Sequence, residues 1–106
     1  MALVARIYDL TKCFPSHEAY GLASQMRRSA VSVPSNIAEG AARKSSAEFL
    51  QFLSVAQGSL SELYTQLELA YMLGYIDDDS HNQTLAEITT VFKMLSGLIR
   101  SLKTRE

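Results

Sequence analysis

The sequence predicts an all-α fold, an antiparallel up-down-up-down four-helix bundle with a proline kink in its second helix. Apolar residues recur at three- and four-residue spacing along almost the whole chain, and no segment alternates as a strand would. The connections between the helical segments are short, which makes consecutive helices antiparallel neighbours. The chain has 106 residues, enough for a single domain over residues 1–106 with one core.

The first two predicted helices are separated by a proline. The first covers about residues 2–13, and its apolar positions have four-three-four spacing at Leu3, Ile7, Leu10 and Phe14. The step from Phe14 to Pro15 ends this helix, because the residue before a proline is pushed out of the α region. Ser16 is the expected N-cap of the second helix, which closes near Lys44. The inner side of that helix carries Leu22, Met26, Ala30, Val33 and Ile37.

Pro34 interrupts the pattern of the second helix. Its nitrogen has no hydrogen for the carbonyl of Ala30, its ring crowds that carbonyl, and it disfavours the α region for Val33. The helix must therefore kink or restart here. Asn36 with Glu39 three positions later resembles a capping box, which would serve the backbone of a restarted helix. Pro34, Asn36 and Glu39 are thus predicted to form a structural hinge.

The third and fourth helices are long and are joined by an acidic turn. Ser45 or Ser46 is expected to cap the third helix, and Gly74 is a natural stop for it. The apolar stripe of the third helix consists of Phe49, Phe52, Ala56, Leu60, Leu63, Leu67 and Ala70. The turn at residues 77–80 puts aspartates before the fourth helix, where the helix dipole favours negative charge. The fourth helix has a heptad pattern of Leu85, Ile88, Phe92, Leu95, Ile99 and Leu102.

Both long helices carry apolar residues outside one narrow stripe. These are Leu50, Leu53, Tyr64, Leu69 and Met72 in the third helix and Val91, Met94 and Leu98 in the fourth. A helix that is apolar on two sides is buried on two sides. We interpret the second stripe as a subunit interface and predict a closed homo-oligomer, the alternative being a wide core within one subunit. Gly58 fits an interface, since a glycine lets another backbone approach closely.

Charge is strongly segregated along a chain whose formal net charge is only −1. Residues 1–44 carry six basic and three acidic side chains, whereas residues 45–92 carry seven acidic side chains and no basic one. Residues 93–106 are basic again. Such blocks indicate complementary helix or subunit faces, or a basic surface on part of the molecule. The alternative is that solvated helix faces differ in charge by chance.

The composition argues against export, a membrane span, and a metal or enzyme site. Cys13 is the one cysteine, which excludes a disulfide within the chain and fits a reducing cytoplasm. Nowhere do 18 apolar residues run together, so no membrane partner is expected. His17 and His81 lack the spacing of zinc ligands and are expected at the surface or as caps. Without a GxSxG, phosphate-loop or calcium-loop motif, we expect no enzyme activity, no metal and no cofactor.

Several motifs resemble those of a known family. They are FPxxExYGLxSQxRRSAVSVPSNIAEGxxR from Phe14, EFxxFLxxAxGSxxEL from Glu48, TQLxLA at Thr65 and LGY at Leu73. Over about residues 3–76 the chain is similar to the 23S rRNA-intervening sequence protein family, named for genes inside insertions in bacterial large-subunit ribosomal RNA genes. The resemblance implies an antiparallel four-helix bundle that assembles as a homopentamer. A relative, the accessory variability protein of diversity-generating retroelements, is a basic pentameric barrel that binds nucleic acid and a reverse transcriptase.

The resemblance implies a nucleic-acid-binding site on basic residues that flank the hinge. Arg27, Arg28 and Arg43 match motif positions of the family, and Lys44 joins them by proximity. The chain departs from the basic relative in its slightly acidic charge and in having no basic residue from Ser45 to Phe92. Pairing of Arg27 or Arg28 with acidic residues of the third helix, Glu48, Glu62 or Glu68, is an alternative role for these side chains.

Two functions from different classes stay open. In the first, the protein is a non-enzymatic oligomeric accessory factor that binds RNA or DNA through repeated basic clusters and the basic C-terminal turn, with a reverse transcriptase or another protein as a further partner. In the second, it is an oligomeric scaffold for another protein and binds no nucleic acid. Tyr8 and Tyr20 do not decide between them, because tyrosines at helical spacing stack on bases less often than they serve as core or rim residues.

Overall fold

The computed structural model describes residues 1–104 and consists of four α-helices. They are α1 (Ala2–Lys12), α2 (Leu22–Ala41), α3 (Ser46–Met72) and α4 (Asp78–Thr104), with a short 3₁₀ turn, η1 (Ser16–Glu18), before α2. Within the described residues there is no strand, so the predicted all-α class is confirmed. No helix in this range is long and apolar enough to cross a membrane.

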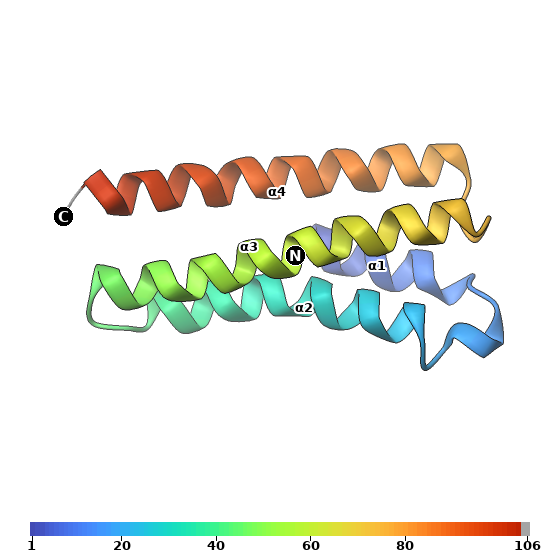
Figure 1. Cartoon of the computed structure of the whole chain (residues 1–106), viewed down its shortest axis with the longest axis horizontal. Coiled ribbons are helices and arrows are strands. Elements are labelled where there is room, and N and C mark those ends of the chain that lie inside the picture. The colour runs from blue at the N-terminus through green and yellow to red at the C-terminus, as the bar shows by residue number, and fades with distance from the viewer. Residues whose placement is uncertain (105–106) are drawn as a thin grey trace.

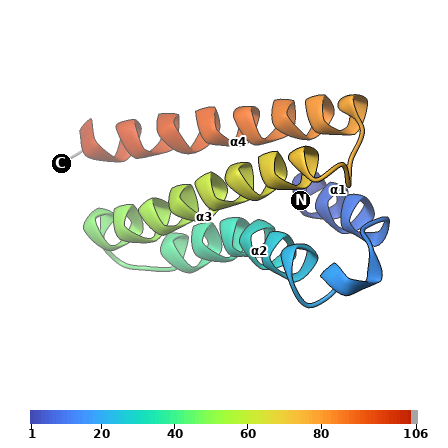
Figure 2. The same cartoon turned by 45° about the vertical axis from the view of Figure 1, so that its right-hand side comes forward.

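The three long helices run along the long axis of a molecule that measures 47 × 24 × 18 Å, and α3 lies between α2 and α4 (Figure 1). Each helix begins at the end of the molecule where the preceding one stops (Figures 1 and 2). The short helix α1 packs against α2 and α4. The helix α1 has 11 residues and is about 16 Å long, whereas α4 has 27 residues and is about 40 Å long. One half of the molecule is therefore built from three helices only.

The buried core confirms most of the predicted stripes. Its fully buried larger side chains include Ile7, Met26, Val33, Leu60, Leu63 and Leu67. Leu53, predicted in the second stripe of α3, is fully buried and belongs to the core, because it lies seven residues before Leu60 on the same helix face. Phe92 was predicted in the core stripe of α4 but is 44% exposed, since it lies to one side of the buried Ile88 and Leu95.

The predicted boundaries of α3 and the start of α4 are correct. The Ser45 hydroxyl accepts the N–H of Glu48 at 3.1 Å and lies 3.2 Å from its carboxylate, which makes Ser45 the N-cap of α3. After the helix, Gly74 takes a positive φ of 78°, a conformation that favours glycine. The N–H of Ser80 donates to the Asp77 carboxylate at 2.7 Å and so satisfies the first turn of α4.

The predicted start of α2 is wrong. Ser16 lies in η1 and its side chain caps nothing; α2 begins only at Leu22. The Glu18 carboxylate accepts the free N–H of Leu22 at 3.1 Å, and its second oxygen accepts the hydroxyl of Tyr75 at 2.9 Å. The hydrogen bond from Leu22, followed by that from Tyr75, lowers the pKa of Glu18. The cap of α2 therefore depends on a residue from the α3–α4 turn.

The helix α2 does not restart at Pro34 but continues from Leu22 to Ala41. The Asn36 side chain donates to the Ser32 carbonyl at 2.8 Å and to the Ser32 hydroxyl at 2.9 Å, as a residue inside a helix. The Glu39 carboxylate binds Arg43 at 3.0 Å instead of reaching back to Asn36. The predicted capping box is thus absent, because an unbroken helix has no N-terminus here to cap. A bend at Pro34 stays a prediction.

Close packing of α2 on α3 depends on Gly40. A methyl group at Gly40 would lie 2.7 Å from Cβ of Phe52 and 2.8 Å from the ring of Phe49. Contacts this short are not tolerated, so the last turn of α2 approaches α3 as closely as a glycine permits. Gly58 differs, because a methyl group there meets no atom within 4 Å.

Candidate nucleic-acid interface

The four predicted basic residues form two separate clusters, as expected of two pairs on either side of Pro34. Arg27 and Arg28 lie in the first turns of α2, whereas Arg43 and Lys44 follow its last turn. Arg43 follows Arg27 by 16 positions, which corresponds to a separation along the helix axis of about 20–25 Å. One nucleotide cannot contact both clusters, so each has to be considered with its own neighbours.

The first cluster surrounds a hollow of about 550 Å³ between α1 and α2, here called the α1–α2 hollow. Its lining residues are Tyr8, Ala19, Tyr20, Ser24, Arg27, Arg28, Val31 and Ser32. Tyr8 comes from α1 and is 40% exposed, and Tyr20 comes from the turn before α2 and is 99% exposed. The fold therefore brings two exposed aromatic rings to the two arginines. The sequence interpretation placed these tyrosines in the core or at a rim, and the structure puts both at the rim.

The two arginines of the hollow differ in their freedom. Arg27 donates from Nε to the Thr11 hydroxyl at 2.8 Å, and its guanidinium carbon lies 4.8 Å from the ring centre of Tyr8. Arg28 is exposed and makes no hydrogen bond or ion pair with the residues that the structure describes. Arg27 is thus a fixed part of the wall, whereas the charge of Arg28 is available to an anion.

The second cluster lies at one end of the molecule, here called the basic end. Arg43 and Lys44, in the α2–α3 turn, and Arg100 and Lys103, near the end of α4, are at the same end (Figures 1 and 2). The Arg43 guanidinium binds Glu39 and lies 4.9 Å from the ring centre of Phe52, while Lys44 is exposed. The sequence analysis treated these basic segments separately, although helices that alternate in direction bring the ends of the second and the fourth helix to one side.

The glutamates of α3 do not bind the two arginines of the hollow. Glu48 interacts with the N-cap of its own helix, Glu68 lies 2.7 Å from His81, and Glu62 is exposed. No hydrogen bond or ion pair joins them to Arg27 or Arg28 in the described part of the chain. The acidic residues of α3 therefore do not neutralise the charge of either arginine.

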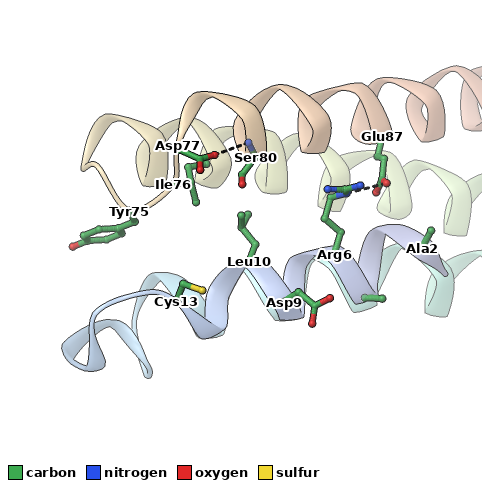
Figure 3. Close-up of a pocket in the computed structure, with 11 residues that line it drawn as sticks. Ala2, Arg6, Asp9, Leu10, Cys13, Tyr75, Ile76, Asp77, Ser80 and Glu87 are labelled. Carbon is green, nitrogen blue, oxygen red and sulfur yellow. Dashed lines mark hydrogen bonds and ion pairs between the residues drawn. The ribbon is translucent and has the colours of Figure 1, made fainter.

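A second hollow of about 620 Å³, the α1–α4 cleft, lies between α1 and the start of α4 (Figure 3). Figure 3 shows Arg6 reaching from α1 to Glu87 of α4, where Nε lies 2.9 Å from a carboxylate oxygen. The same guanidinium donates to Gln83 at 3.1 Å. The remaining charged groups in the lining are Asp9 and Asp77. Since the one basic group is already paired, this cleft is poorly suited to phosphate.

His81 joins α3 to α4 and is buried, although the sequence favoured a surface or capping position. Its Nε2 lies 2.7 Å from the Glu68 carboxylate, and its ring stacks on Tyr71 with 4.2 Å between ring centres. The Tyr71 hydroxyl donates to the Asp78 carboxylate. The hydrogen bond to Glu68 outweighs burial and raises the pKa of His81. Spacing alone gave no signal for this contact, because Glu68 lies on the other side of the turn.

The described residues contain no group of three or more His, Cys, Asp or Glu side chains placed to hold a metal ion. The fold and surface together define a small α-helical bundle whose notable exposed groups are basic and aromatic. The chain belongs to the 23S rRNA-intervening sequence protein family, whose model matches residues 1–97. The match includes most of α4, beyond the segment that carried the resemblance in the sequence. No curated protein shows significant similarity to it.

A solved structure supports the same assignment. It is a protein with unknown function from the S23 ribosomal protein family of Bacteroides thetaiotaomicron VPI-5482. The two chains are 26% identical, the match covers 92% of each, and the TM-score is 0.85. This neighbour extends the fold assignment over nearly the whole chain and carries no activity with it.

Proposed function

We propose that the protein is a cytoplasmic, non-enzymatic accessory protein that binds RNA or other nucleic acid through basic clusters repeated around a homopentamer. The observation that carries the proposal is the free charge on α2 and its following turn. Arg28 and Lys44 are exposed, and the acidic residues of α3 do not neutralise Arg27 or Arg28. Exposed lysine and arginine side chains neutralise phosphates, and the counterions released from the nucleic acid favour binding.

Assembly is supported by apolar groups on the outer side of α3. Residues at four-three spacing, Gln51, Val55, Gly58, Glu62, Thr65, Leu69 and Met72, are all exposed and form the outer α3 stripe. Val55, Leu69 and Met72 are 52%, 44% and 79% exposed. A second copy packed along this stripe would remove these three side chains from water. Five copies are proposed on the family resemblance.

A ring makes a small cluster effective. The net charge of one chain is −1, so the molecule as a whole does not attract nucleic acid. Repeating the α1–α2 hollow and the basic end by symmetry converts later contacts with one strand into intramolecular steps, and overall affinity rises by about 10²–10⁴ when the geometry permits.

The proposal also includes a bend of α2 at Pro34 that shapes the bundle for assembly, and a reverse transcriptase or other protein as a further partner.

A second candidate function is a protein scaffold that binds no nucleic acid. It is favoured by an apolar groove of about 400 Å³ between α3 and α4. Tyr64 and Phe92, 45% and 44% exposed, line this groove on its two sides. A partner helix with an apolar face would fit such a groove.

Retention of the protein on structured RNA in increasing salt tests the proposal, with the mass of the assembled species measured by native mass spectrometry. We expect a closed oligomer that is retained at low salt and released as the salt concentration rises. An oligomer with no retention on RNA or DNA would favour the scaffold. A monomer at micromolar concentration would contradict the assembly.

A further inference from the structure

We propose that the α1–α2 hollow binds an unpaired nucleotide of single-stranded RNA or DNA, with Tyr20 stacking on the base and Arg28 contacting the phosphate. The inference rests on the proposed function and adds the class of ligand. Phosphate contacts alone do not distinguish a duplex from a single strand, whereas a base-stacking site accepts only bases that are free of a partner.

The composition of the hollow points to this ligand. The charged residues that line it are Arg27 and Arg28, both basic, so an anion is favoured. The aromatic residues that line it are Tyr8 and Tyr20, so a flat ring is favoured as well. A volume of about 550 Å³ lies in the range of about 300–1,000 Å³ that is usual for small-molecule sites. A nucleotide combines a negative charge and a flat ring in one unit.

Tyr20 is the stacking group because almost its whole side chain is exposed. A tyrosine ordinarily buries about 150–250 Å² of surface, and a ring left 99% exposed at the rim of a hollow has both faces open to a base. The turn that carries it is held in place, since the neighbouring Glu18 binds both Leu22 and Tyr75. Because the backbone of this turn is held in place, stacking of a base has to order only the two side-chain torsions of Tyr20.

Arg27 and Tyr8 also line the hollow and lie against each other. The guanidinium lies over the Tyr8 ring and is anchored to Thr11, whose hydroxyl donates in turn to the carbonyl of Ile7 at 2.7 Å. Bases stack on arginine planes as they do on aromatic rings, so this fixed pair serves as a second flat surface. Its positive charge also favours the phosphate that Arg28 contacts.

Fluorescence anisotropy of labelled 20-nucleotide strands tests the inference on the full-length protein. The probes are single-stranded oligo(U), single-stranded oligo(dT) and a duplex DNA of equal length at low salt. We expect Tyr20→Ala to weaken binding of both single strands roughly 5- to 150-fold, the effect of removing one stacked base. Tyr20→Phe keeps the ring and is expected to bind like the wild type. Duplex binding is expected to be unaffected by either change.

Two further variants separate stacking from charge. Arg28→Gln is expected to weaken the single strands and to flatten their salt dependence, whereas Lys93→Gln removes an exposed charge from α4, away from the hollow, and serves as the matched control. Circular dichroism of each variant checks the fold. We expect the fold to be unchanged, because Tyr20, Arg28 and Lys93 are all exposed.

The outcomes distinguish this inference from the proposed function. If Tyr20→Ala binds single strands as tightly as the wild type while replacing basic residues weakens every probe, the stacking site is wrong and the phosphate-binding function stands. If the wild type binds none of the three probes but is retained on structured RNA, this inference is wrong and the proposed function stands; if it binds neither these probes nor structured RNA, both are wrong. A preference for oligo(U) over oligo(dT), or the reverse, identifies which single strand the hollow accepts.

Discussion

The contrast between Gly40 and Gly58 gives a sharp test of the packing. Replacing either glycine with alanine inside a helix gains about 1 kcal/mol from helix propensity. At Gly58 the added methyl group meets open space, so the gain remains. At Gly40 it lies 2.7 Å from Cβ of Phe52, which is fixed to the α3 backbone, so the helices must separate. Overpacking of this kind costs about 1–3 kcal/mol.

We therefore expect Gly40→Ala to be about 1–3 kcal/mol less stable than Gly58→Ala, since the propensity gain is common to both. In a domain of this size each kcal/mol moves the melting temperature by roughly 4–8 °C. Thermal unfolding followed by circular dichroism measures the difference. Gly97→Ala, where a methyl group also meets no atom within 4 Å, is a second control in α4.

The same variants report on assembly, because Gly58 lies in the outer α3 stripe. If native mass spectrometry shows a smaller oligomer for Gly58→Ala but not for the other variants, that stripe is part of the subunit interface. If Gly40→Ala is as stable as Gly97→Ala, the close approach of α2 and α3 at Gly40 is refuted.

Three further changes test the remaining contacts. Tyr75→Phe removes the hydroxyl that binds Glu18 and is expected to lower the melting temperature and to speed hydrogen exchange in the first turn of α2; unchanged exchange would contradict the cap. Because the contact with Glu68 raises the pKa of His81 above 6.5, its stabilisation is complete below that pH and falls as the pH rises through the raised pKa. His81→Gln is expected to lose this dependence, which begins as the pH rises above 6.5, and an equal dependence in both proteins would contradict the assignment. Pro34→Ala is expected to impair assembly, whereas an unchanged oligomer with a higher melting temperature would show that the proline is incidental.

Local signals in the sequence predicted the helices well. The ends of α3 could be predicted, with Ser45 or Ser46 as the cap and Gly74 as the stop, because a serine cap and a glycine stop act through their own backbone neighbours. The prediction that Ser16 caps α2 was wrong, because the start of that helix is not set by local residues alone. The true start of α2 depends on Glu18 together with Tyr75, which lies 57 residues later and is invisible to a local pattern.

The residues of the candidate site were proposed from the sequence, but their arrangement was not. The sequence left open whether Arg27 and Arg28 face solvent or pair with the acidic third helix, and the structure shows Arg28 exposed and Arg27 bonded to Thr11. Nor could the sequence show that Tyr20 lines the same hollow, since that depends on where the turn after α1 places its ring. That Arg43 and Lys103 share one end of the molecule does follow from the predicted up-down-up-down order, because the second and fourth helices of such a bundle end on the same side.

The central claim is that the basic residues of α2 and its following turn bind phosphates. The direct measurement is the salt dependence of RNA binding by the wild type and by a variant with Arg27, Arg28, Arg43 and Lys44 all replaced by Gln, with fold and mass confirmed for both. Each phosphate contact contributes about −0.7 to the slope of log affinity against log salt on single strands. We predict a steep slope for the wild type and a much flatter one for the variant. Equal slopes, or no binding by the wild type at about 50 mM salt, would contradict the claim.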